Sequence, residues 1–69
     1  METPIVHLQT WLKEIGYSVG PVNGEYKAHL ERAVLHFQTH FMGAGATGRV
    51  NAQTAALIYA VRQANPVAP

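Results

Sequence analysis

The chain has 69 residues with a formal net charge of +1, and 48% of its residues are hydrophobic while 13% are charged. This length allows one small domain, because a chain of this size buries enough apolar surface for a single core only. The composition is that of a folded globular protein, and five Lys and Arg residues are too few for the basic surface of a nucleic-acid-binding domain. The absence of cysteine excludes disulfides and thiolate metal sites.

The first predicted helix begins close to the N-terminus. Thr3 is a favourable N-cap, and Pro4 suits the first helical position. Apolar residues then recur at three- and four-residue steps, which places them on one helical face. The members of this stripe are Ile5, Leu8, Leu12 and Ile15. Trp11 lies at the edge of the stripe, Val6 projects from the other side, and Gly16 is expected to end the helix as its C′ residue.

Residues 17–24 are predicted to form a structured loop between the first two helices. Asn23 and Gly24 give a strong turn signal, because both residue types tolerate positive φ. Val19 and Val22 are the expected inward-facing anchors of this loop. The loop is therefore expected to be held against the core rather than to hang free.

The second predicted helix is the longest and the most strongly periodic. It runs from about Ala28 to Phe41 or Met42. The residues of its inner face, counted from the preceding turn, are Tyr26, Leu30, Ala33, Val34, Phe37 and Phe41. Residues 42–48 follow, are rich in glycine and alanine, and are predicted to be a flexible connection.

The third predicted helix has Asn51 as its N-cap, and Val50 is placed to pack onto its first turns as a hydrophobic staple. Its inner face contains Thr54, Leu57, Ile58 and Val61. The expected fold is all-α: a small three-helix bundle over residues 1–64, with a long structured loop between the first and second helices. Residues 65–69 are expected to form a flexible tail.

Catalytic and metal-binding groups are sparse. The chain has no aspartate and one serine, Ser18, and its glutamates form no recognisable acid–base pair. We therefore expect no catalytic residue, no cofactor and no metal. His29, His36 and His40 fall on one face of the second helix beside Arg32. We interpret this face as solvated rather than as a metal site, because a closed zinc site needs four ligands. A separate hypothesis is that the imidazoles become cationic in acid and favour binding of anionic wall polymers.

Several short motifs recur in a fixed order along the chain. They are Leu8-Gln9, Leu12, Gly16-Tyr17, Gly-Pro-Val-Asn-Gly at 20–24, Tyr26, Ala33-Val34, Phe37-Gln38, and Gly-Arg-Val-Asn at 48–51 with Thr54 and Leu57. In this order and spacing they resemble the peptidoglycan-binding domain of the type 1 family, a three-helix module attached to many cell-wall hydrolases. The chain departs from that pattern at Asn23, where the family has Asp, at Lys27-Ala28, where it has Gly-Pro, and at Leu30, where it has Thr.

The resemblance implies non-catalytic binding of bacterial peptidoglycan, through its glycan or its stem peptide, which targets a partner activity to the cell wall. The expected ligand contacts are Tyr17, Ser18, Asn23, Gly24 and Tyr26. For Tyr26 the alternative is a core role that holds the loop down. Such a module acts at the wall, in the periplasm or outside the cell, although the N-terminus has no signal-peptide pattern.

The alternative function is that of a protein-docking subunit with the same fold, in a phage particle or a secretion assembly. Leu35 and Met42 form a second apolar stripe on the second helix, and with Trp11 they are the candidate partner contacts. The other interpretation of this stripe is that it covers the end of a neighbouring helix. The expected partners are peptidoglycan and a cell-wall hydrolase or an assembly protein, with neither nucleic acid nor a membrane.

Overall fold

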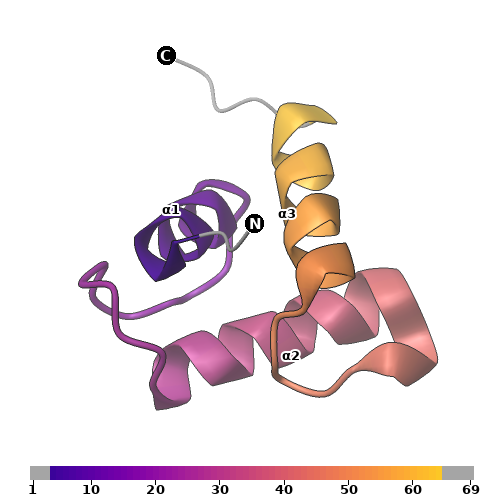
Figure 1. Cartoon of the computed structure of the whole chain (residues 1–69), viewed down its shortest axis with the longest axis horizontal. Helices are drawn as coiled ribbons and strands as arrows, with labels where there is room; N and C mark the ends of the chain where they lie inside the picture. Colours follow the sequence, from indigo (N-terminus) through magenta and orange to yellow (C-terminus); the bar gives the residue numbers. More distant parts are fainter. Residues whose placement is uncertain (1–3, 65–69) are drawn as a thin grey trace.

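The computed structural model describes residues 4–64, apart from the side chain of Ala44. Three α-helices follow one another, α1 (Ile5–Glu14), α2 (Ala28–Met42) and α3 (Ala52–Ala64), and the 3₁₀ turn η1 (Gly43–Gly45) directly follows α2. Figure 1 shows α2 along one side of the molecule, with α1 and α3 next to each other above it. The predicted all-α class is confirmed. None of the helices within residues 4–64 is long and apolar enough to cross a membrane.

Pro4 sets the start of α1. It occupies the position before the first helical residue, with φ of −57° and ψ of 142°. Its carbonyl accepts the N–H groups of His7 at 3.1 Å and Leu8 at 3.3 Å. The prediction that Pro4 is itself the first helical residue is wrong by one position, because its ψ is extended rather than helical. The predicted N-cap, Thr3, lies outside the described residues, as does the predicted tail at 65–69.

Gly16 ends α1, as predicted. Its φ is +104°, a conformation that is strained for residues with a Cβ atom. The Gly16 N–H donates to the Lys13 carbonyl at 3.1 Å, and the Tyr17 N–H donates to the Leu12 carbonyl at 2.9 Å. These two bonds form a Schellman motif. The chain therefore leaves α1 in a fixed direction and carries Tyr17 back along the core.

The core draws residues from all three helices and from the loop between α1 and α2. Its buried members are Leu8, Leu12, Val19, Leu30, Ala33, Val34, Phe37, Ala55 and Ile58. Phe37 is the largest of them and is completely inaccessible. The stripes of the three helices and the inward anchor Val19 are confirmed by this core. Each large aliphatic or aromatic side chain buried in this way contributes about 1.5–3 kcal/mol.

Two apolar residues that were predicted to face inward lie at the surface. Val22 is 39% exposed, because the backbone of its turn faces inward to make hydrogen bonds and its side chain is directed outward. Phe41 is 44% exposed and stacks on Phe37 at a ring-centroid distance of 4.7 Å. Figure 1 shows the end of α2 projecting past α3, so the helical stripe continues beyond the helices that could cover it.

The connection between α2 and α3 is more ordered than predicted. It contains η1, and the N–H groups of Thr47 and Gly48 donate to Oε1 of Gln38 at 2.9 and 2.8 Å. The prediction of a flexible connection is therefore wrong at this end, which is hydrogen-bonded to α2. The predicted cap of α3 is confirmed, because the Thr54 N–H donates to Asn51 Oδ1 at 2.8 Å.

Candidate functional site

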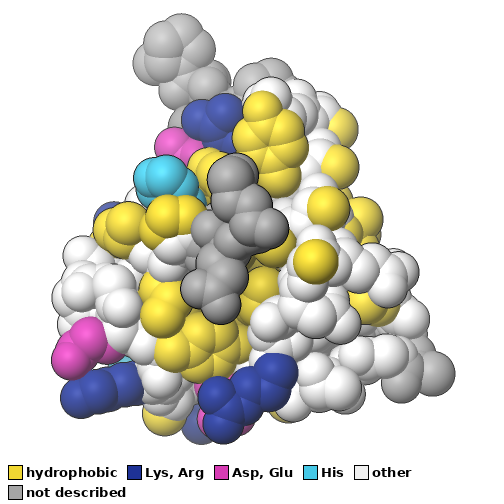
Figure 2. All heavy atoms as spheres, viewed as in Figure 1, with side chains coloured by type: hydrophobic (Ala, Val, Ile, Leu, Met, Phe, Trp, Pro, Cys, Tyr) yellow, Lys and Arg dark blue, Asp and Glu magenta, His cyan; other side chains and the backbone are white. Residues whose placement is uncertain are grey.

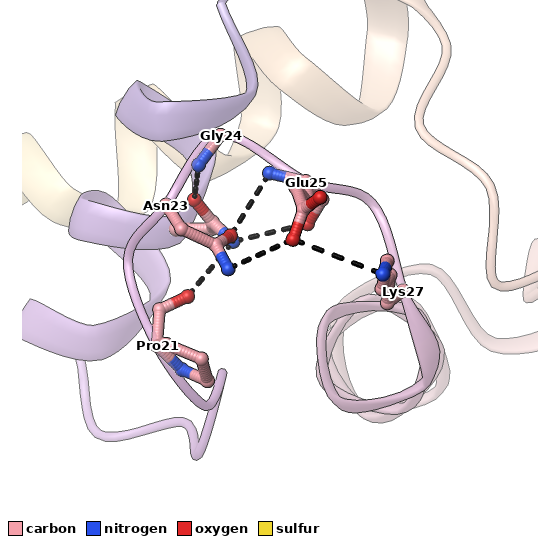
Figure 3. Close-up of polar contacts among 6 residues, drawn as sticks. Pro21, Asn23, Gly24, Glu25 and Lys27 are labelled. Carbon is pink, nitrogen blue, oxygen red and sulfur yellow. Dashed lines mark hydrogen bonds and ion pairs between the residues drawn. The ribbon is translucent and has the colours of Figure 1, made fainter.

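A buried glutamine, Gln9, organises the turn that contains two of the predicted ligand residues. Its Oε1 accepts the Gly24 N–H at 2.9 Å, and its Nε2 donates to the carbonyls of Pro21 and Glu25, each at 3.1 Å. Nε2 also lies 3.4 Å from Asn23 Oδ1. Figure 3 shows the turn residues curving around these contacts. One side chain of α1 therefore fixes the conformation of the turn.

Asn23 closes the same turn on itself. Its Oδ1 accepts the Glu25 N–H at 3.0 Å, and its Nδ2 donates to Glu25 Oε1 at 3.1 Å. The carboxylate of Glu25 in turn lies 3.8 Å from Lys27 Nζ at the start of α2 (Figure 3). The polar atoms of Asn23 are thus engaged within the turn. Asn23 stabilises the turn as a neutral residue, without the charge that an aspartate would carry at this position.

A second buried glutamine, Gln38, holds the start of α3 in the same way. Its Oε1 accepts the N–H groups of Thr47 and Gly48. Its Nε2 donates to the Arg49 carbonyl at 2.9 Å and to Thr54 Oγ1 at 3.2 Å. Gln9 and Gln38 are each only 1% exposed, so each carboxamide replaces its lost water contacts with backbone partners.

The motifs in the sequence predict no role for either glutamine. A signal for both was available: Gln9 follows Leu8 and Gln38 follows Phe37, so each sits within the buried face of its helix. A polar side chain at such a position needs internal hydrogen-bond partners. The glycine-containing turns downstream expose the backbone N–H and C=O groups that meet this need.

Tyr26 links the first turn to the start of α3. Its hydroxyl donates to the Gly48 carbonyl at 2.6 Å, and the guanidinium carbon of Arg49 lies 5.7 Å from its ring centroid. Desolvation by burial raises the pKa of Tyr26 above its ordinary value of 10.0, while the charge of Arg49 acts in the opposite direction. These contacts support the core role that was the alternative interpretation of Tyr26.

An open groove of about 770 Å³ lies between α1 and α3. It is lined by Ile5, Leu8, Trp11, Tyr26, Val50, Asn51, Ala52, Ala55, Ala56 and Tyr59. Figure 2 shows apolar side chains gathered in this part of the surface, with basic side chains along its lower edge. The rings of Trp11 and Tyr59 meet edge to face, with centroids 5.3 Å apart. None of the lining residues carries a charge, so the groove suits an apolar or mixed ligand.

One of the five predicted ligand residues lines the groove, and the other four lie outside its lining. Tyr26 lines the groove, whereas Asn23 and Gly24 form the turn described above. Tyr17 is half-buried, its ring lies edge-on to a core aromatic ring at 5.9 Å, and burial raises its pKa. Ser18 is exposed beside it. Only Tyr26 is placed by the structure in the groove.

The three predicted partner contacts differ in their surroundings. Trp11 is half-buried and lines the groove. Leu35 is 40% exposed on α2. Met42 is half-buried, and its Sδ lies 3.7 Å from Thr54 Oγ1, which donates to it. Met42 therefore packs toward α3, in agreement with the interpretation that part of this stripe covers a neighbouring helix.

The three histidines of α2, His29, His36 and His40, are exposed. Within residues 4–64, no group of three His, Asp or Glu side chains lies close enough together to hold a metal ion. The ring of His40 packs edge-on against Phe41, with centroids 4.7 Å apart.

With three helices and an uncharged groove between two of them, the chain has the form of a small binding domain. A family model described as "Putative peptidoglycan binding domain" matches residues 2–58, and the chain belongs to this family. The match confirms the resemblance drawn from the motifs, and it includes every residue that lines the groove except Tyr59. The curated proteins and the solved structures that were compared with the chain gave no match.

Proposed function

We propose that this domain binds bacterial peptidoglycan through the groove between α1 and α3. The groove itself carries the proposal, because it is concave, about 770 Å³ in volume and lined by apolar and aromatic side chains, as small-ligand sites usually are. Trp11 and Tyr59 form its aromatic edge. Aromatic side chains of this kind contribute strongly to binding, because they bury a large area with little loss of conformational freedom.

The domain acts, in this proposal, without catalysis of its own. It holds a partner activity, such as a cell-wall hydrolase, on an insoluble substrate and so raises the local concentration of that activity. Modest affinity is sufficient, because the wall presents many copies of the same ligand. The site of action is then the wall itself, in the periplasm or outside the cell.

The predicted loop contacts remain a second candidate surface for the same ligand. Tyr17 and Ser18 present a half-buried ring and an exposed hydroxyl, and a sugar or peptide could meet both. Asn23 and Gly24 would contribute mainly by holding the turn in place, since their polar groups are bonded to Gln9 and Glu25. Variants in the loop and in the groove distinguish the two surfaces.

Co-sedimentation with purified peptidoglycan sacculi at low salt tests the proposal. The full chain is expected to pellet with sacculi, and Tyr59→Ala is expected to weaken binding at least about fivefold, as loss of an interface aromatic does. Phe41→Ala is the matched control, because Phe41 is 44% exposed and Tyr59 is 47% exposed, but only Tyr59 lines the groove. Circular dichroism melts of both variants serve to check that they remain folded.

Three outcomes separate the possibilities. Equal pelleting of Tyr59→Ala and the unaltered chain would show that the groove is not the binding surface. Loss of pelleting in Tyr17→Ala alone would move the ligand to the loop surface. No pelleting of the unaltered chain would contradict wall binding.

The second candidate function is a protein-docking subunit in a phage particle or secretion assembly. Two observations favour it: the uncharged walls of the groove and the exposed Leu35 suit an apolar protein segment as well. This function predicts that the chain fails to pellet with sacculi and is recovered in a stoichiometric complex from purified particles. Leu35→Ser is then expected to weaken the complex.

A further inference from the structure

We propose that the groove takes the stem peptide of peptidoglycan rather than its glycan, and that Arg49 pairs with the carboxylate at the end of that stem. The inference rests on the proposed function and names the part of the polymer that the site recognises. Three features support the inference: the polar groups that line the groove, the small side chains on its α3 side, and Arg49 at one end.

Three polar side chains that line the groove each have one atom hydrogen-bonded inside the domain. Asn51 Oδ1 accepts the Thr54 N–H at 2.8 Å. The Tyr26 hydroxyl donates to a backbone carbonyl at 2.6 Å, and the Tyr59 hydroxyl accepts from Gln63 Nε2 at 2.8 Å. A glycan strand presents many hydroxyl and acetamido groups, which lose water on binding and need hydrogen-bond partners in return. These walls supply few, which disfavours the glycan.

The α3 side of the groove is lined by small side chains. Ala52, Ala55 and Ala56 lie there along one face of α3, and the rings of Trp11 and Tyr59 also line the groove. A surface of methyl groups admits the backbone and methyl side chains of a short peptide at close range. Peptidoglycan stems are rich in alanine of both configurations, so their side chains match this surface in size and polarity.

Charge gives the direction of the peptide. Arg49 lies over the ring of Tyr26, which lines the groove, with its guanidinium carbon 5.7 Å from the ring centroid. Its Nε is 3.9 Å from Glu31 Oε2, and the two side chains are 75% and 50% exposed. An exposed ion pair at this distance is weak, and a guanidinium has five donors. The first turn of α3 lies at the same end, and its positive dipole also favours an anion there.

Glu31 is the one acidic side chain paired with Arg49 among the ion pairs of residues 4–64. It competes with a ligand carboxylate for the same guanidinium. Removal of its charge therefore has a definite expected sign: Glu31→Gln should strengthen binding of a stem peptide that ends in a free carboxylate. A purely structural role of this pair would not change the preference between two ligands.

The test is a nuclear magnetic resonance titration of the full chain with three soluble probes. The probes are a stem pentapeptide ending in D-alanyl-D-alanine, the same peptide with a C-terminal amide, and a tetrasaccharide of N-acetylglucosamine. The free-acid peptide is expected to shift the backbone amides of Ala55, Ala56 and Tyr59, and to bind about two- to fivefold more tightly than the amide, as an exposed charge pair allows. The tetrasaccharide is expected to leave these amides unshifted.

Two variants assign the preference to one side chain. Arg49→Gln should abolish the difference in affinity between the acid and the amide. Arg32→Gln, which removes an exposed arginine of α2, is the matched control and should retain the difference. Glu31→Gln should enlarge it.

The inference is overturned if the tetrasaccharide shifts the groove amides as strongly as the peptide, or if Arg49→Gln keeps the preference for the acid. Pelleting with sacculi separates this failure from that of the proposed function. If the chain pellets with sacculi but does not bind the soluble peptide, it still binds the wall, and only the stem-peptide inference is wrong.

Discussion

Gln9 and Gln38 perform the same task at two places in the chain. Each is a buried side chain on a helix, each accepts backbone N–H groups of a turn through Oε1, and each donates to backbone carbonyls through Nε2. The first holds the turn before α2, and the second holds the turn before α3. Because a carboxamide offers both acceptors and donors, no apolar residue of similar size can replace it.

Gln38→Leu is expected to lower the free energy of unfolding by about 2–4 kcal/mol, since it leaves buried backbone N–H groups without an acceptor. For a domain of this size, with a total stability of only ~3–5 kcal/mol, this is close to complete unfolding. Urea denaturation followed by circular dichroism measures the change. Gln53→Leu applies the same chemical change at an exposed site of α3 and should leave stability nearly unchanged. Equal effects at the two sites would contradict the assigned role of Gln38.

The raised pKa of Tyr26 predicts that the free energy of unfolding depends on pH in the alkaline range. Desolvation raises its pKa in the folded state, so the folded chain holds the phenolic proton more strongly than the unfolded chain. The resulting stability is complete below pH 10, the ordinary pKa of tyrosine, and is lost as the pH rises through the higher folded-state value. The free energy of unfolding of the unaltered chain should therefore fall more steeply above pH 10 than that of Tyr26→Phe. Parallel pH profiles for the two chains would contradict this linkage.

At the scale of elements, the end of α1 directs the loop, because the Schellman motif at Gly16 fixes the path of the chain that follows. Gly16→Ala is expected to lower the free energy of unfolding by about 1–2 kcal/mol. An added Cβ would meet no other atom within 4 Å, so the expected loss comes from the backbone φ of +104° and not from a steric clash. Gly45→Ala is the control: its added Cβ would make an ordinary contact of 3.7 Å with Met42. Thermal melts of the two variants give the comparison, and an equal loss would point away from backbone strain.

The helices could be predicted from the sequence, because apolar residues that recur at three- and four-residue steps lie on the same helical face. The inner residues Leu30, Val34 and Phe37 are buried as predicted. The same periodicity failed at Phe41, because it does not report where the neighbouring helices stop. The separate expectation that Val22 anchors the loop was wrong, because the conformation of that turn depends on a side chain of α1 that is distant in sequence.

At the scale of the whole molecule, the groove depends on how α1 and α3 meet. Its two aromatic edge residues, Trp11 and Tyr59, lie on different helices and far apart in sequence. An ion pair between Arg62 Nε and Glu14 Oε1, at 2.9 Å, joins the same two helices. Local patterns describe each helix alone, so they placed Trp11 only at the edge of its stripe. The motifs identified the family, and the structure adds that Gln9 holds the turn that they emphasise.

The most direct test of binding in the groove uses Trp11, which is the only tryptophan of the chain and lines the groove. Its fluorescence is measured with and without solubilised peptidoglycan fragments, together with its quenching by acrylamide. If the ligand binds in the groove, the fragments should shift the emission to shorter wavelength and reduce the quenching, because a bound ligand shields the indole from water. Unchanged emission and quenching under conditions in which the chain pellets with sacculi would contradict binding in the groove and place the ligand on another surface.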